Sequence, residues 1–117
     1  MFALLLACAT LPLPEPSDAM VAASPVAGVT VTELLHGRQL LQTRCGNCHA
    51  VPHPDDARSP DWSTVYADMA RRARLSSEDA RWIDVYMRAA AAIPAAPIPA
   101  AAIPASAIPA AAIPAAL

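Results

Sequence analysis

The chain has 117 residues, with ten acidic and eight basic side chains, and a formal net charge of −2 at pH 7. A chain of this length has room for one domain at most. All eight basic residues are arginine, and this charge balance gives no indication of nucleic-acid binding.

The chain begins like an export signal. Residues 1–8 form a short apolar run that ends in small residues and Cys8. Leu5-Leu6-Ala7-Cys8 resembles the lipobox at which bacterial lipoproteins are cleaved and lipidated, and ordinary cleavage after Ala19 or Ala23 is the alternative. No stretch reaches the ~20 unbroken apolar residues that a membrane-spanning helix needs. We therefore expect residues 1–31 to be a signal or lipoprotein-like segment and a linker, with possible membrane attachment through lipidated Cys8.

The linker is expected to lead into a first helix. Residues 11–29 are rich in Pro, Ala and Ser, so they predict a segment with no fold of its own. Thr30 then offers a cap to a leucine-rich stretch whose spacing predicts a helix that reaches Cys45. Gly37 lies inside this helix, where glycine costs about 1 kcal/mol relative to alanine. It either permits close packing of another helix or is a tolerated accident.

Cys45-Gly46-Asn47-Cys48-His49 is the most informative stretch of the chain. Two cysteines separated by two residues and followed by histidine can bond the two vinyl groups of one haem, while the imidazole binds its iron. A zinc site would need two further ligands, and only His49 and His53 are nearby. A thioredoxin-like motif would need a βαβ frame, whereas the flanking residues predict helices. Covalent haem attachment therefore accounts best for these residues.

Two more helices are expected after the motif. Residues 50–56 contain two prolines and predict an irregular loop. Ser59-Pro60-Asp61 predicts the start of a helix that runs to about Arg74, and Ser76 is the expected cap of a last helix. The apolar face of the former comprises Trp62, Val65, Tyr66, Met69 and Ala73, and that of the latter comprises Ala80, Ile83, Tyr86, Met87 and Ala90. Trp82 and Val85 flank the second stripe, and the pattern leaves open which of them is buried.

Residues 93–117 form a low-complexity tail in which Ile-Pro recurs every five residues. Repeated prolines favour a polyproline-II-like or disordered chain. The tail is either a stiff spacer or a segment with no packed structure and no essential role.

The order of helix, CxxCH, loop, helix with methionine and closing helix resembles the small monohaem class of c-type cytochromes over about half the chain. The resemblance implies an all-α fold in residues 32–92, with the first and last helices crossing near Gly37 and wrapped around one covalent haem c. It implies that Cys45 and Cys48 carry the thioethers and that His49 is the proximal iron ligand. It also implies maturation in the periplasm or at the outer face of a bacterial membrane.

The sixth iron ligand must come from the opposite face of the porphyrin. Met69 is our choice because it shares an apolar face with Trp62 and follows the proline-containing loop. The alternative is a core role, which methionine on an apolar stripe usually has. Met87 is the fallback, and neither His53 nor His36 is a strong candidate.

The function expected on these grounds is electron transfer by a haem cycling between Fe(II) and Fe(III), in a monomer without catalytic residues that meets redox partner proteins. A ligand-binding or sensing haem protein with an open sixth site, or a haem subunit of an oxidoreductase complex, is the alternative. Arg71, Arg72 and Arg74 could form a positive docking patch for an acidic partner, or a solvated helix face. A domain of about 60 residues buries little surface, so we expect the haem-free chain to fold poorly.

Overall fold

The structure is a computed structural model that describes residues 12–46 and 50–94. Within these ranges all regular elements are helices, which confirms the all-α expectation for that part of the chain. They are α1 (Asp18–Ala23), α2 (Val31–Leu40), the π-helix η1 (Leu41–Cys45), the 3-10 helix η2 (Pro54–Arg58), α3 (Trp62–Arg72) and α4 (Ser77–Ala91). None of the described helices is long and apolar enough to cross a membrane. The predicted Ile-Pro tail beyond Pro94 lies outside the described residues.

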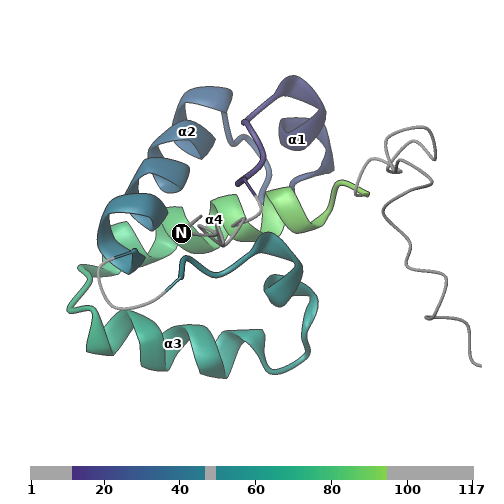
Figure 1. Cartoon of the computed structure of the whole chain (residues 1–117). Coiled ribbons are helices and arrows are strands. Elements are labelled where there is room, and N and C mark those ends of the chain that lie inside the picture. The colour runs from purple at the N-terminus through teal and green to yellow at the C-terminus, as the bar shows by residue number, and fades with distance from the viewer. Residues whose placement is uncertain (1–11, 47–49, 95–117) are drawn as a thin grey trace, which may run out of the picture.

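Helices α2 and α4 form the central pair of the fold (Figure 1). Gly37 is buried where they meet, and a Cβ atom there would clash with the carbonyl oxygen of Trp82 and lie 2.9 Å from the Cβ of Tyr86. Leu34 and Leu41 are fully buried on the same helical stretch. The glycine therefore permits the close helix contact, and the predicted crossing near Gly37 is confirmed.

The start and the continuation of α2 follow the sequence prediction. The Thr30 hydroxyl accepts a 3.2 Å hydrogen bond from the Glu33 amide, and the Glu33 carboxylate accepts one of 2.8 Å from the Thr30 amide. This reciprocal capping box satisfies two amides at the helix N-terminus. Beyond Leu40 the chain continues as η1, in which the Thr43 hydroxyl donates a 2.9 Å bond to the Gln39 carbonyl. The helical stretch thus delivers the chain to Cys45, as expected.

Residues 12–29 differ from the linker that their composition predicted. Ser17 caps α1 by accepting a bond from the Met20 amide, and the Met20 side chain is only 1% exposed in the core. The expectation that these residues carry no fold was wrong because a six-residue helix is too short to show an apolar period. The Ser17-Asp18 pair, a cap followed by an acid in the first turn, is the signal that could have revealed it.

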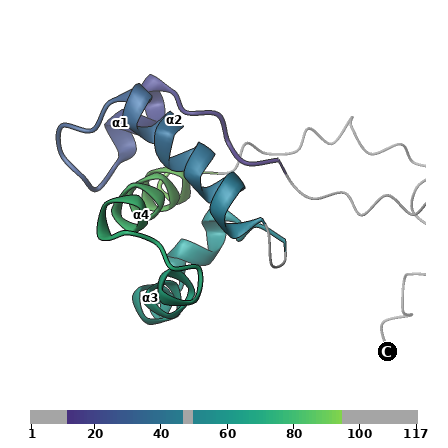
Figure 2. The same cartoon turned by 90° about the vertical axis from the view of Figure 1, so that its left-hand side faces the viewer.

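Helix α3 lies on the opposite side of α4 from α1 and α2, as Figures 1 and 2 show. Of its predicted apolar face, Trp62 and Tyr66 are buried, and Met69 and Ala73 are half-buried. Val65 differs from the prediction, because it is 49% exposed at the edge of this face. The helix begins at Trp62, three residues later than Ser59, which was predicted to cap it. Ser59 instead ends η2, with its amide donating to the Asp56 carbonyl.

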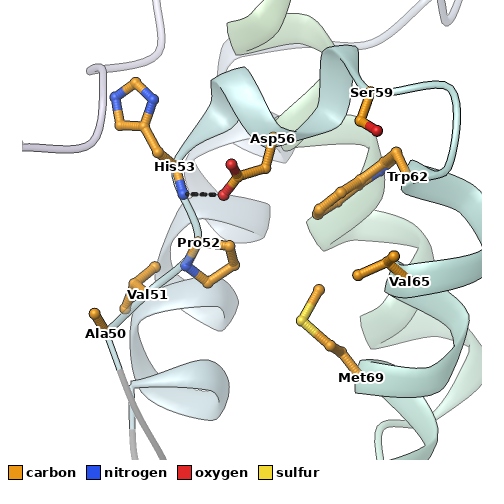
Figure 3. A pocket seen from close by; sticks show the side chains of 9 residues that line it. All are labelled: Ala50, Val51, Pro52, His53, Asp56, Ser59, Trp62, Val65 and Met69. Atoms are coloured by element: carbon orange, nitrogen blue, oxygen red, sulfur yellow. Dashed lines mark hydrogen bonds between the residues drawn. The ribbon is translucent and has the colours of Figure 1, made fainter.

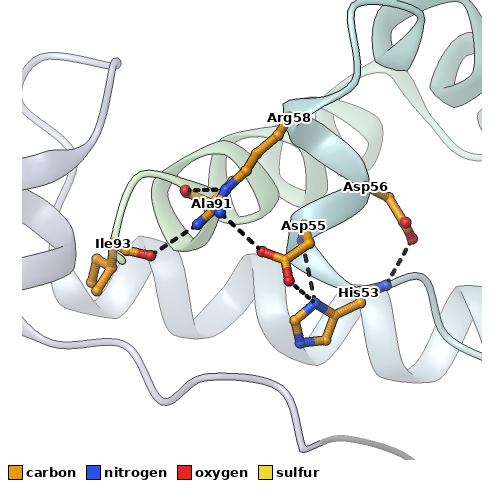
Figure 4. Close-up of polar contacts among 6 residues, drawn as sticks. All are labelled: His53, Asp55, Asp56, Arg58, Ala91 and Ile93. Carbon is orange, nitrogen blue, oxygen red and sulfur yellow. Dashed lines mark hydrogen bonds and ion pairs between the residues drawn. The ribbon is translucent and has the colours of Figure 1, made fainter. Parts of the chain in front are cut away.

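The loop after the motif contains η2, where the prolines had predicted irregular structure. Pro54 occupies the first turn, where the amide that proline lacks has no helical partner to lose. The His53 side chain caps this helix by accepting a 3.3 Å bond from the Asp55 amide. Arg58, at the other end of η2, donates a 2.9 Å bond to the carbonyl of Ala91 and so holds the end of α4 (Figure 4).

Helix α4 starts and buries its apolar stripe largely as predicted. The Ser76 hydroxyl accepts a 3.0 Å bond from the Asp79 amide. The structure also settles the open choice beside the stripe, because Val85 is buried whereas Trp82 is half-buried. The buried residues of the helix are Ile83, Val85, Tyr86, Met87, Ala89 and Ala90.

Candidate functional site

A pocket of about 520 Å³ lies between the segment that starts at residue 50 and the inner face of α3 (Figure 3). Met69, Val65 and Trp62 project into it from α3. The remaining lining residues are Ala50, Val51, Pro52, His53, Asp56 and Ser59. Apolar side chains therefore lie on both sides of the pocket, Ala50, Val51 and Pro52 on one side and Trp62, Val65 and Met69 on the other.

The pocket adjoins the predicted haem motif in the chain, and Cys45 is not among its described lining residues. Cys45 is half-buried at the end of η1, and Ala50 is the first lining residue after the motif. Cys48 and His49, the second predicted thioether and the predicted proximal ligand, lie outside the described residues. The first wall of the pocket therefore begins directly after the position of His49 in the chain.

Gly46 is needed where the chain leaves η1. A Cβ atom at this position would lie 2.7 Å from the carbonyl oxygen of Gln42, which is closer than real Cβ contacts. It would also lie 3.5 Å from a methyl group of Val51, an ordinary packing distance. The glycine is therefore required by the Gln42 carbonyl at the end of η1, whereas the contact with Val51 would accommodate a side chain.

The two methionines weighed as iron ligands have different surroundings. Met69 is half-buried and lines the pocket. Met87 is fully buried in the core and is absent from the pocket lining. The positions therefore favour Met69 as the thioether available to a group in the pocket, while its ligation stays a prediction.

The histidines also separate clearly. His36 is exposed on α2, whereas His53 lines the pocket. The Nδ1 atom of His53 lies 3.3 Å from the Asp55 carboxylate and accepts a hydrogen bond from the Asp55 amide (Figure 4). Sequence reasoning considered His53 a weak candidate for the sixth ligand and did not predict its place in the pocket wall.

The Asp84 carboxylate of α4 is one of the groups that hold the wall formed by α3. Asp84 accepts a 2.8 Å bond from the indole nitrogen of Trp62 and another of 2.8 Å from Arg88. Trp62 stacks on Tyr66 with ring centroids 5.2 Å apart. Burial raises the pKa of Tyr66 well above its usual range, and the nearby charges of Asp84 and Cys45 add to this effect. The aromatic pair is therefore a rigid, neutral support behind the pocket.

The predicted docking cluster is partly neutralised within α3. Arg71 and Arg72 donate bonds of 2.6 and 2.7 Å to the two carboxylate oxygens of Asp68. These bonds lower the pKa of Asp68. Arg74 is exposed just beyond the helix. The cluster of three arginines and one aspartate keeps a positive balance on an exposed surface.

The apolar lining of the pocket and the Met69 sulfur are compatible with a haem. Within residues 12–46 and 50–94, no three His, Cys, Asp or Glu side chains gather to hold a metal ion. Apolar walls with a few polar groups are typical of cofactor sites, and a thioether is a known axial ligand of haem iron.

No family model, curated protein or solved structure matches this chain.

Proposed function

We propose that the protein is an electron carrier with one covalently attached c-type haem. Cys45 and Cys48 would hold the haem through thioether bonds, and His49 and Met69 would bind its iron. When bound, the haem supplies reversible one-electron chemistry between ferrous and ferric iron.

One observation carries the proposal: a mostly apolar pocket adjoins the CxxCH motif in the chain and has a thioether on its far wall. Its volume of about 520 Å³ falls in the range of roughly 300–1,000 Å³ that is usual for small-molecule and cofactor sites. Ala50 follows His49 directly, and Met69 projects from α3. The two cysteines of the motif, His49 and Met69 could therefore all bind the same group.

The side chains around the pocket have two tasks in this proposal. The apolar side chains, Val51 and Trp62 among them, limit access of water and lower the local dielectric. Met69 offers a soft sulfur donor, which favours the ferrous state and raises the reduction potential. Such a potential suits a carrier late in a respiratory or dehydrogenase chain.

The proposal also concerns where the protein works and what it meets. By its resemblance to c-type cytochromes, the chain matures outside the cytoplasmic membrane, in agreement with its signal-like start. Its partners are redox proteins, one donating and one accepting an electron, and the carrier itself is a monomer.

The test compares absorption spectra of the purified wild-type protein, Met69→Leu and Met87→Leu. Leucine conserves volume, so each variant should lose less than about 1.5 kcal/mol of stability. We expect a low-spin ferric spectrum with the weak red sulfur-to-iron band in wild type and in Met87→Leu, and loss of that band only in Met69→Leu.

Two outcomes count against this assignment. Loss of the sulfur band only in Met87→Leu would move the distal ligand to α4. A five-coordinate, high-spin wild-type spectrum would contradict the carrier and favour a haem protein that binds or senses a ligand at an open sixth site.

A further inference from the structure

We infer that residues 13–29 are a permanent part of the working protein, so any cut by a signal peptidase lies N-terminal to Leu13. The inference rests on the proposed function in one respect, because covalent haem attachment implies export. The sequence left two kinds of processing open, cleavage at Cys8 and cleavage after Ala19 or Ala23. The packing of the described residues distinguishes them.

The segment before α1 binds both helices of the central pair. The Tyr86 hydroxyl of α4 donates a 2.7 Å hydrogen bond to the Pro14 carbonyl. The Arg38 guanidinium of α2 lies 2.8 Å from the Glu15 carboxylate and 3.4 Å from the Leu13 carbonyl. Residues 13–17, which we name the strap, therefore connect α2 and α4 on one side of the molecule (Figure 2).

Helix α1 extends this attachment into the core. Met20 is 1% exposed and belongs to the same buried cluster as Leu34 and Tyr86. Cleavage after Ala19 would cut α1 in two, and cleavage after Ala23 would remove it entirely together with the strap. Either cut would open the core of the domain to water.

The residues under the strap also depend on it electrostatically. The Arg38 side chain is 17% exposed, and its Nε atom is buried without a hydrogen-bond partner among the described residues. The strap supplies two partners for the rest of this guanidinium, the Glu15 carboxylate and the Leu13 carbonyl. Cleavage beyond the strap would remove these partners of Arg38 together with the Pro14 carbonyl that accepts the Tyr86 hydroxyl.

The direct test is the N-terminus of the mature protein. The full chain is produced in a bacterium that makes c-type cytochromes, and the exported protein is examined by intact mass and N-terminal peptide mapping. An N-terminus at or before Leu13 supports the inference, and a start at Cys8 with a fatty-acid label that is lost in Cys8→Ser would locate the cut. A start at Met20 or Ser24 overturns it.

The N-terminus of the exported protein can be determined whether or not the protein carries haem. Absence of haem from a chain that keeps Leu13 would contradict the proposed function and leave the inference standing. A haem-bearing chain that starts at Ser24 would do the reverse.

A second measurement asks whether α1 packs in the exported protein. Met20→Asp replaces a buried side chain and Ala19→Asp its exposed neighbour in the same helix. We expect the unfolding temperature to fall on the order of 10 °C for Met20→Asp and to change little for Ala19→Asp. Equal unfolding temperatures for wild type and both variants would overturn the inference, since they would mean that α1 contributes nothing to the folded protein.

Discussion

Gly37 of α2 faces Tyr86 of α4 so closely that a Cβ atom at position 37 would lie 2.9 Å from the Cβ of Tyr86. The backbone carbonyl of Trp82 lies closer still, and a backbone atom cannot rotate away as a flexible side chain can. The spacing of the central helix pair therefore depends on the absence of a side chain at this point.

Gly37→Ala should destabilise the protein by about 1–3 kcal/mol, because overpacking outweighs the gain of about 1 kcal/mol in helix propensity. Urea unfolding measures the difference. His36→Ala, at the exposed neighbouring position of the same helix, is the control and should be nearly neutral. A Gly37→Ala variant more stable than wild type would show that α2 and α4 can separate without cost.

Tyr86 should make stability fall in alkaline solution. Burial raises its pKa to about 12 from an ordinary value of 10.0. Below pH 10 the phenol is neutral in both states, whereas between pH 10 and 12 it ionises mainly in the unfolded chain. The raised pKa of Tyr86 therefore contributes up to about 3 kcal/mol to the free energy of unfolding. This contribution is complete below pH 10 and is lost as the pH rises through 12.

The measurement is urea unfolding of wild type and Tyr86→Phe from pH 8 to pH 12. The variant should lose about 1 kcal/mol at pH 8, because the bond to the Pro14 carbonyl is gone, and should fall less steeply above pH 10. Tyr66, whose pKa is also raised by burial, remains in both proteins. Parallel curves would contradict the assignment.

Arg74 has a backbone conformation that favours glycine. Its φ angle is 53°, in the left-handed region, just after the end of α3. Arg74→Gly should stabilise the protein by about 0.5–1 kcal/mol, the relief of strain being partly offset by the greater freedom of glycine in the unfolded chain. Thermal unfolding would show the gain, and Ala67→Gly inside α3 should show a loss of about 1 kcal/mol. A loss of stability in both variants would contradict this reading of the helix end.

The local features of this fold were readable in the sequence, whereas the long-range ones were not. Thr30 and Ser76 were identified as caps because the capping partner lies three residues away in each case. The bond between Trp62 and Asp84 joins positions 22 residues apart, and no periodicity relates them. The contacts of residues 13–17 could not be predicted for the same reason, because their partners Arg38 and Tyr86 belong to helices far along the chain.

The candidate site was predictable to a similar degree. The CxxCH motif predicts haem attachment through the spacing of three residues, so that expectation needs no tertiary information. Met69 and Met87 both lie on apolar stripes, and packing alone shows that Met69 reaches the pocket while Met87 fills the core. Val51 and Pro52 form a wall because η2, which follows them in the chain, packs against α4. This is a tertiary contact that the local sequence does not reveal.

The arginine cluster of α3 gives a prediction for partner binding. Combined Arg71→Glu and Arg72→Glu substitutions should slow association with an acidic redox partner on the order of tenfold at low salt while leaving the haem spectrum unchanged. The wild-type rate should fall as ionic strength rises. Arg81→Glu, at an exposed position of α4, is the matched control. Rates that respond neither to salt nor to charge reversal at Arg71 and Arg72 would make the cluster an ordinary solvated surface.

Covalent haem attachment through Cys45 and Cys48 is the central claim, and intact mass of the denatured protein tests it most directly. Protein made in a host that matures c-type cytochromes should carry the added mass of one haem and keep its visible absorption after denaturation. The Cys45→Ala, Cys48→Ala double variant should lose both, and its unfolding should no longer be cooperative. A wild-type chain of unmodified mass under these conditions would contradict the account.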